Sequence, residues 1–431
     1  MLTFLKKEEK GMKIDFLVKN CSQLITLFGD SPRRGEDMKD LKIIKDGFIG
    51  SYGGKIVFIG NEDMLKDYEI DENAKIIDAT GKVCMPGLVD SHTHLPFGGD
   101  RSEEFKMKLD GVPYMELQKR GMGIKSTVRA TREIPLSELI KISQKRLDES
   151  VKGGATTIEA KSGYGLDLET EIKQLEAIKT LNELHPLDII PTYLGGHDVP
   201  PDTGKEEYLE KLINEFIPEI KKRNLAKFFD AFIEDGVYNR EETEKMLKAA
   251  KENGFELKLH ADEFTNLGGA ELAAEYGARS AEHLVRISKT GIEALSKSGT
   301  AAVILPGVYF FLREDKKPPV REMIERGVIV ALGSDYNPGS SHINNMLFIM
   351  KLAVFLEGFS IEEAITSATI NAAYAIGMDK EVGSLVPGKK MDLIIFDTDS
   401  YINIFYEPSK NYLKYVIKEG EIILDGCELI Y

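Results

Sequence analysis

The sequence alternates two kinds of apolar pattern from about residue 86 to about residue 380, and this alternation constrains the fold more than any other feature. A helix-like pattern over 138–154 precedes a strand-like run over 155–162, and a second helix-like pattern over 241–254 precedes a run over 255–262. Such a cadence is typical of parallel βα units, whose helices pack against the sheet. The chain has 431 residues and is 42% hydrophobic, so it is long enough for such a core and a smaller companion domain.

Two histidines, His92 and His94, end the apolar run over 86–94. Side chains in a strand alternate between the two faces, so residues i and i+2 point the same way and both imidazoles can reach one ion. Paired histidines also occur as ordinary surface or core residues. The pair alone therefore leaves a metal site and a structural role as two open alternatives.

His260 and Asp335 stand where two further strand-like runs, FELKLH and VIVALGSD, stop and loops begin. In a (β/α)8 barrel the catalytic residues come from the carboxyl ends of several strands, which is where these two residues and the histidine pair lie. Three neutral imidazoles and one carboxylate suit a borderline divalent ion such as zinc or ferrous iron. The sequence therefore predicts an α/β protein with a (β/α)8 TIM-like barrel that binds a metal ion.

Strand-like runs joined by glycines and charged turns occupy both ends of the chain. If these runs form one sheet assembly, residues 12–85 and 381–431 build a small β-sandwich domain, and the barrel domain of residues 86–380 is inserted in it. The ends of the chain would then lie close together. The runs cover 13–20, 22–27, 47–60 and 74–85 near the start, and 392–397, 412–420 and 421–426 near the end.

Charge, cysteine usage and hydropathy exclude several classes of function. The formal charge is −15 and the pI is near 5.2, so the chain lacks the basic face that nucleic acid requires, and we expect no nucleic-acid partner. Cys21, Cys84 and Cys427 form no CxxC pair, which favours free thiols in a reducing compartment. The chain contains no apolar run of the roughly 18 to 20 residues that cross a bilayer, and its start is rich in lysine and glutamate. We therefore expect a cytoplasmic protein with no membrane partner.

Six segments between residues 86 and 341 resemble the amidohydrolase superfamily and, within it, the imidazolonepropionase family, whose members act in histidine degradation. The ending EVGSLVPGKKMDLIIFD resembles the tail of the superfamily in general and says little about substrate. The six segments are PGLVDSHTHLPFGGDRSEEF, IKSTVRATR, GGATTIEAKSGYGLDLETE, KLHADEFTNLGGAELAAEYGARSAEHL, ILPGVYFFLRE and SDYNPGSS.

The resemblance implies one divalent metal ion per subunit, Zn²⁺ or iron, and a homodimer. It also implies catalytic roles for three residues: Asp335 as general base through its second carboxylate oxygen, with His283 and Glu263 handling the water and the proton that reaches the leaving nitrogen. Which of the three protonates that nitrogen stays open. Lys161 invites comparison with the carboxylated lysine of two-metal relatives, but it lies in the KSGYG run of the one-metal subtype, so we expect no bridging role. The implied metal ligands are His92, His94, His260 and Asp335.

The family's substrate carries a carboxylate tail and an amide-like ring, and the resemblance implies which side chains bind it. Arg101 is the match for the tail, because a guanidinium fork fits the two oxygens of a carboxylate. Without the motif, a surface arginine paired with Glu103 or Glu104 would be the plainer interpretation. Without the resemblance, Tyr164 would be interpreted as loop packing, His197 as a structural histidine, and the segment from Asn337 to Ser340 as a turn. The other substrate contacts that the resemblance implies are Tyr164, His197, Glu263, Asn337, Gly339 and Ser340.

The function implied by the resemblance is hydrolysis of the ring C–N amide bond of 4-imidazolone-5-propanoate to N-formimidoyl-L-glutamate by a metal-activated water. A second possibility is another one-metal amidohydrolase, such as a deaminase of a small heterocycle. Arg101 and Tyr164 distinguish the first possibility from the second, because a neutral nucleobase has no carboxylate that would need a binding group. A third is a non-catalytic relative that uses the barrel as an interaction scaffold, although this chain retains every candidate ligand. The metal content of the purified protein separates the scaffold from the enzymes.

Overall fold

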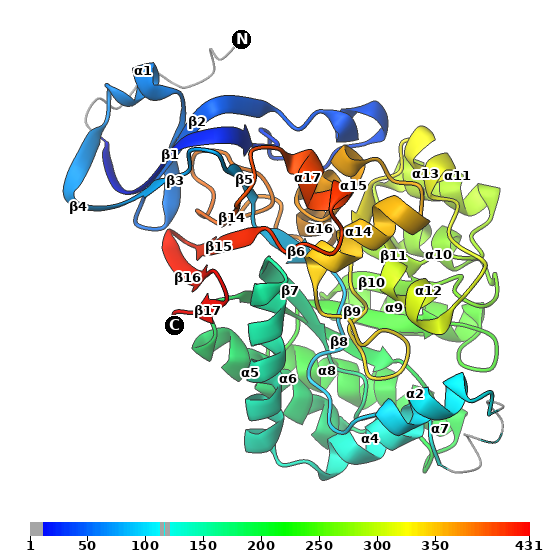
Figure 1. Cartoon of the computed structure of the whole chain (residues 1–431). Helices are drawn as coiled ribbons and strands as arrows, with labels where there is room; N and C mark the ends of the chain where they lie inside the picture. Colours follow the sequence, from blue (N-terminus) through cyan, green and yellow to red (C-terminus); the bar gives the residue numbers. More distant parts are fainter. Residues whose placement is uncertain (1–11, 113–115, 117–120) are drawn as a thin grey trace.

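The computed structural model of the chain describes residues 12–112, 116 and 121–431 (Figure 1). Its strands form two sheets, one of eight strands and one of nine. The first eleven residues, whose lysines and glutamates bear on the expected cytoplasmic location, lie outside the described residues. Within the described part of the chain, no helix is both long enough and apolar enough to span a membrane.

Eight parallel strands form the larger body, and each pairs with the next in chain order. The first and last approach each other at the bridge between Thr93 and Tyr336, where the Asp335 N–H also donates to the His92 carbonyl at 2.9 Å, so the sheet closes into a barrel. The strands are largely buried, as parallel strands are when helices cover them outside. The predicted fold class is confirmed. The strands are β6 (Leu88–Asp90), β7 (Ala155–Lys161), β8 (Asp188–Gly196), β9 (Phe228–Ile233), β10 (Glu256–Ala261), β11 (Ser280–His283), β12 (Ala301–Ile304) and β13 (Val330–Leu332).

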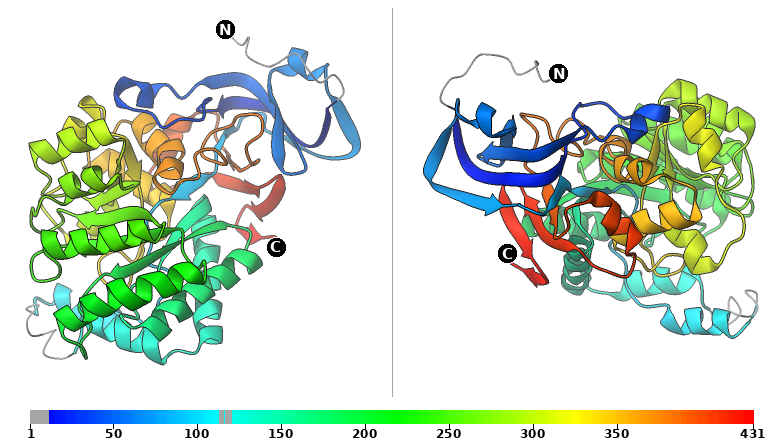
Figure 2. Two further views of the ribbon diagram at one scale, coloured as in Figure 1. Left: turned by 180° about the vertical axis from the view of Figure 1, so that it is seen from behind. Right: turned by 45° about the horizontal axis from the view of Figure 1, so that its top comes forward.

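Helices surround the barrel strands (Figures 1 and 2). Several begin where the sequence supplies a cap: the Asp167 carboxylate accepts an N–H of the first turn, and Asn239 and Ser360 each form a capping box. Helix α1 (Glu62–Leu65) lies away from the barrel, beside the other sheet (Figure 1). The remaining helices of the described residues are α2 (Ser102–Leu109), α4 (Ile124–Glu133), α5 (Leu136–Lys152), α6 (Leu168–Leu184), α7 (Lys205–Lys211), α8 (Ile217–Lys222), α9 (Arg240–Glu252), α10 (Gly269–Tyr276), α11 (Lys289–Ser298), α12 (Pro306–Leu312), α13 (Val320–Glu325), α14 (Met346–Leu356), α15 (Ile361–Ser367), α16 (Ile370–Ala375) and α17 (Tyr401–Tyr406), with a 3₁₀ turn η1 (Gly35–Lys39) and a π-helical turn η2 (Leu212–Phe216).

The remaining strands come from both ends of the chain and share one mixed sheet of nine strands. Figure 2 shows the first strands, in blue, beside the last, in red. The antiparallel pairing of Pro86 with Leu393 joins the two halves next to the barrel. The exact boundaries of a separate β domain stay a prediction. The strands are β1 (Lys13–Ile25), β2 (Ile43–Tyr52), β3 (Lys55–Gly60), β4 (Glu69–Asp78), β5 (Val83–Pro86), β14 (Leu393–Phe396), β15 (Leu413–Lys418), β16 (Glu421–Asp425) and β17 (Glu428–Leu429).

The first strand differs from the sequence-based expectation of two separate runs. Residues 13–20 and most of 22–27 form the single strand β1, whose register against β2 shifts between Val18 and Cys21. Asn20 adopts φ = 59° at this point, a left-handed conformation that asparagine tolerates better than most residues. The polar residues that resemble a turn in the sequence are therefore a β-bulge, which bends the strand without ending it.

Candidate active site

The four side chains predicted as metal ligands converge at the carboxyl ends of the barrel strands. His92 Nε2 lies 3.3 Å from His94 Nε2 and 3.3 Å from Asp335 Oδ1. His94 Nε2 lies 3.0 Å from Asp335 Oδ1 and 3.4 Å from His260 Nε2. In a tetrahedral site with bonds of about 2.0–2.1 Å, ligand atoms are about 3.3 Å apart. The spacing of these atoms fits one ion.

Burial and charge also fit a cation at this point. The four side chains are at most 4% exposed, and Asp335 Oδ1 accepts no hydrogen bond from the described residues. A buried oxygen without a partner costs free energy unless an ion or water satisfies it. Burial lowers the pKa of His92 and His94, so both rings stay neutral and can bind a metal.

Two residues of the site have an unusual backbone conformation. Asp335 has φ = 52° and His283 has φ = 70°, and both lie where a barrel strand passes into a loop. A residue with a Cβ adopts this left-handed region at a cost, and such conformations cluster at functional sites, where the surroundings hold them. Here the Asp335 N–H is held by the His92 carbonyl at 2.9 Å, and the His283 carbonyl accepts from the Tyr309 hydroxyl at 3.1 Å.

The loop after β13 fixes the second oxygen of Asp335. Asn337 Nδ2 donates to Asp335 Oδ2 at 3.0 Å, and Ser340 Oγ donates to the same oxygen at 3.3 Å. The Asn337 side-chain oxygen in turn accepts the N–H groups of Gly339 and Ser340, both at 2.8 Å. The resemblance implies substrate contacts for these three loop residues, and the structure shows that Asn337 and Ser340 hydrogen-bond the candidate base.

Three aromatic rings form one wall of the site. The rings of His94 and His197 are stacked, with centroids 5.0 Å apart, and Tyr164 lies edge-on to His197 at 5.2 Å. His197 Nδ1 lies 2.9 Å from the Gly163 carbonyl, which can only accept, so Nδ1 carries the proton and Nε2 is left as an acceptor. Burial holds the pKa of His197 well below its usual value, so this ring is neutral. A flat ligand ring can pack on this wall.

His283 and Glu263 lie side by side next to the candidate metal ligands. His283 Nδ1 lies 3.5 Å from Glu263 Oε1, and both side chains are buried. Burial lowers the pKa of His283 to about 3. Burial, and then the charge of Asp335, raises the pKa of Glu263 well above its ordinary value. The site therefore combines a neutral imidazole with a carboxyl group that keeps its proton more readily than usual.

Arg101 is paired with Glu104 and also lines the cavity. Its Nε and Nη2 donate to Glu104 at 3.0 and 2.6 Å, as the plainer interpretation expects. Its side chain is nevertheless only 12% exposed and lines the same cavity as Tyr164 and Asp335. Arg101 is therefore not a surface arginine.

One cavity of about 1110 Å³ contains these groups. The predicted site residues line it, apart from His92, which lies fully buried behind them. Those that line it are His94, Arg101, Tyr164, His197, His260, Glu263, His283, Asp335, Asn337, Gly339 and Ser340.

A layer of buried charges inside the barrel was missed in the sequence. Lys161 Nζ lies 2.9 Å from Glu159 and 2.8 Å from Asp230, and none of these side chains is exposed to solvent. Lys258 Nζ lies 3.0 Å from Glu159 and 3.4 Å from Glu282, which are also fully buried. The signal was present as charged residues within apolar strand runs, at positions that alternation directs into the barrel. Lys161, whose comparison with a bridging lysine was considered, is engaged by two carboxylates.

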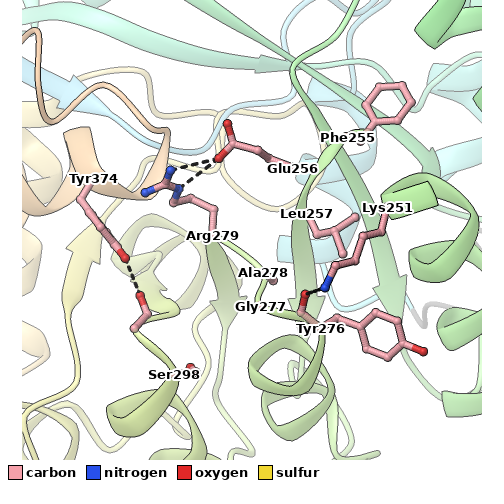
Figure 3. A pocket seen from close by; sticks show the side chains of 11 residues that line it. Lys251, Phe255, Glu256, Leu257, Tyr276, Gly277, Ala278, Arg279, Ser298 and Tyr374 are labelled. Carbon is pink, nitrogen blue, oxygen red and sulfur yellow. Dashed lines mark hydrogen bonds and ion pairs between the residues drawn. The ribbon is translucent and has the colours of Figure 1, made fainter. Parts of the chain in front are cut away.

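A second cavity, of about 340 Å³, lies at the opposite, amino ends of strands β10 to β12 (Figure 3). Its polar groups satisfy one another: Arg279 Nη2 donates to Glu256 at 3.0 Å, and the Lys251 ammonium donates to the Tyr276 carbonyl at 2.8 Å. None of the described residues that line this cavity is a histidine. We therefore place the candidate active site in the larger cavity.

Comparison with known proteins agrees with this geometry. The model of the amidohydrolase family matches residues 83–423. The imidazolonepropionase of Alkaliphilus oremlandii is 44% identical over 97% of this chain and 100% of its own, and that of Geobacillus kaustophilus is 46% identical over 95% and 97%. A solved triazine hydrolase variant has a TM-score of 0.69 at 16% identity, covering 96% of both chains. An adenosine deaminase from Xanthomonas campestris with bound zinc has a TM-score of 0.68 at 16% identity, covering 97% and 95%. At such identities the two structures show the shared fold alone.

Proposed function

This chain belongs to the amidohydrolase family and, within it, to the imidazolonepropionases, and from that membership we propose that it hydrolyses 4-imidazolone-5-propanoate to N-formimidoyl-L-glutamate in histidine degradation. The observation that carries the proposal is the cavity of about 1110 Å³ whose lining brings the imidazoles of His94 and His260, backed by buried His92, and the carboxylate of Asp335 together with the guanidinium of Arg101. The first set suits hydrolysis of an amide, and the guanidinium suits a substrate with a carboxylate tail.

The proposed cofactor is one divalent metal ion per subunit, zinc or iron, held by His92, His94, His260 and Asp335. The spacing of their ligand atoms and the unsatisfied Asp335 Oδ1 support this set. When bound, such an ion lowers the pKa of its water to about 7 and polarises the carbonyl under attack. Imidazole and carboxylate ligands serve both metals, so availability decides between them.

The proposed roles of the acid–base groups follow from their protonation. Asp335 Oδ2, steadied by Asn337 and Ser340, takes the proton of the attacking water. The neutral ring of His283 donates a hydrogen bond to the oxygen that becomes negative at the ring carbonyl. Glu263, whose pKa is raised, gives its proton to the ring nitrogen as the C–N bond breaks. The water oxygen ends on the carbonyl carbon, which balances the reaction.

The proposed substrate contacts divide between the ring and the tail. Tyr164 and His197 pack on the ring, and Arg101 binds the propionate. Asn337, Gly339 and Ser340, which line the cavity, are the proposed contacts of the loop with the substrate, and Asn337 and Ser340 also hydrogen-bond Asp335.

A homodimer in the cytoplasm is proposed from the family. The exposed rings of Phe310 and Phe348 have their centroids 5.7 Å apart and form an apolar surface. A second copy of the chain that covered this surface would remove it from water. Light scattering in solution measures the oligomeric state, and a monomer at micromolar concentration would contradict the dimer.

Turnover of imidazolone propionate, followed by the loss of its ultraviolet absorbance, tests the proposal against a panel of cyclic amides and nucleobases. The metal content of the same preparation is measured in parallel. We expect kcat/KM to be highest for imidazolone propionate. Preference for a nucleobase would replace the proposal by deamination of a heterocycle, and metal-free protein that zinc or ferrous ion cannot activate would favour a scaffold.

Arg101→Met is expected to raise KM about 10- to 150-fold, because it removes a charge-assisted contact worth roughly 1.5 to 3 kcal/mol while keeping much of the side-chain volume. An imidazolone without the tail should be a poor substrate of the wild type and should be affected little by the change. The measurement is kcat/KM of both enzymes with both substrates, expressed as a coupling energy. A coupling near zero would mean that Arg101 does not contact the tail.

A further inference from the structure

The carboxylate of Glu104, on α2, lies between two cations at the edge of the cavity. Glu104 Oε1 is 2.6 Å from Arg101 Nη2 and 2.9 Å from Lys108 Nζ. Glu104 Oε2 accepts from Arg101 Nε at 3.0 Å and from the Gly123 N–H at 2.7 Å. The Glu104 side chain is 3% exposed, so a buried carboxylate with four hydrogen-bond donors lies behind Arg101, Lys108 and Gly123, which line the cavity.

The Glu104 carboxylate accepts hydrogen bonds from one edge of the Arg101 guanidinium and does not contact Nη1 at its other edge. A guanidinium presents five N–H donors in a planar fork. Glu104 takes the edge formed by Nε and Nη2. No described residue accepts a hydrogen bond from Nη1, and this group lies against Gly339, where an added Cβ would be 2.2 Å from it. At the edge formed by Nη1 and Nη2, the Glu104 carboxylate therefore contacts only Nη2, and the backbone of Gly339 packs directly against the guanidinium.

The charges of this cluster do not cancel. Arg101 and Lys108 are two cations against the one carboxylate of Glu104, and both cations line the cavity with Tyr164. Burial alone would raise the pKa of Glu104, but its hydrogen bonds with Arg101 and Lys108 lower it to about 2, so it is ionised at any working pH. One positive charge remains, which matches a single carboxylate.

We propose that Glu104 is a positioning residue that holds the Arg101 guanidinium so that its Nη1–Nη2 edge receives the carboxylate of the substrate. This inference rests on the proposed function, in which Arg101 binds the propionate tail. Glu104 does not touch the substrate and acts through the arginine, while Gly339 provides the space in which the fork lies. A guanidinium without this partner would rotate among several rotamers and would lose entropy on each binding event.

Glu104→Gln is expected to raise KM for imidazolone propionate about 5- to 30-fold, because a neutral amide holds the fork more weakly than a carboxylate. The value of kcat should stay within about twofold, since the reacting groups lie elsewhere in the cavity. The matched control is Glu103→Gln, which removes the same charge from the preceding residue of α2, whose side chain is exposed. The control should leave KM unchanged.

Two further measurements distinguish a positioning role of Glu104 from a purely structural role, in which its hydrogen bond with Gly123 only connects α2 to the start of α4. Glu104→Gln should leave turnover of an imidazolone without the tail unchanged, and it should add little to KM in an Arg101→Met background. Glu104→Asp keeps the charge but withdraws the carboxylate from the fork, so it should also raise KM, and it provides the test if the glutamine variant does not fold.

The outcomes distinguish this inference from the proposed function. An unchanged KM in both Glu104 variants, or an equal rise for substrates with and without the tail, would overturn the inference alone. A wild type that turns over neither substrate would overturn the proposed function and the inference with it. A rise confined to the tailed substrate and absent from the Arg101→Met background supports positioning.

Discussion

Asp335→Asn is expected to lower kcat about 10²- to 10⁴-fold in metal-loaded protein with the fold intact, because loss of general-base catalysis typically costs that much. Asparagine tolerates the left-handed backbone of this position, where φ = 52°, so the substitution changes the charge more than the conformation. It also weakens one proposed ligand. Turnover is therefore measured at saturating zinc or ferrous ion, and the bound metal is quantified separately.

Asp262→Asn is the matched control for this prediction. Asp262 also follows a barrel strand and also has a left-handed backbone, with φ = 52°. Its carboxylate accepts the N–H groups of Gly269 and Ala270 at 3.2 and 3.1 Å and is not among the groups that line the cavity. The control should keep kcat within about twofold of the wild type. Turnover of metal-loaded Asp335→Asn within a few-fold of the wild type would remove Asp335 from the mechanism.

The convergence of the candidate ligands could be predicted because it follows from strand geometry. His92 and His94 share a face by alternation, and the ends of parallel strands meet at one edge of a barrel. Whatever occurs at several strand ends must then lie close together, however far apart it is in the sequence. Strand geometry does not depend on the direction of individual side chains, which is why the barrel and the grouping of His260 with Asp335 both follow from apolar patterns.

Contacts that depend on the direction of a side chain could not be predicted in this way. The sequence allows Arg101 either a surface carboxylate or a ligand, and the structure gives it Glu104 and a place in the cavity together. The hydrogen bonds from Asn337 and Ser340 to Asp335 depend on the path of a short loop. The bulge at Asn20 could not be predicted either, because the polar residues Lys19 and Asn20 give the same sequence pattern whether the strand bends or ends there.

The charges inside the barrel give the second large expected effect. Three carboxylates, those of Glu159, Asp230 and Glu282, face the two ammonium groups of Lys161 and Lys258, and all are fully buried. Burial alone would lower the pKa of Lys161, but Asp230 and Glu159 raise it above its usual value, so it stays charged. Each charge in this layer is tolerable only because its opposites lie beside it.

Lys161→Met is expected to reduce the free energy of unfolding by about 3 to 5 kcal/mol, the typical effect of removing one partner of a buried ion pair. Three buried carboxylates would then face one ammonium group, and Asp230 would lose its lysine. Urea unfolding is measured on metal-free protein, because a bound ion would stabilise the folded state by itself. The control is Lys141→Met on α5, where the lysine is 64% exposed and the cost should be below about 0.5 kcal/mol. Equal stability of the two variants would show that the layer of buried charges does not hold the barrel together. The metal content of the metal-loaded variants is measured separately. If the wild type bound two metal ions and Lys161→Met bound one, Lys161 would have the bridging role that its two carboxylate contacts argue against.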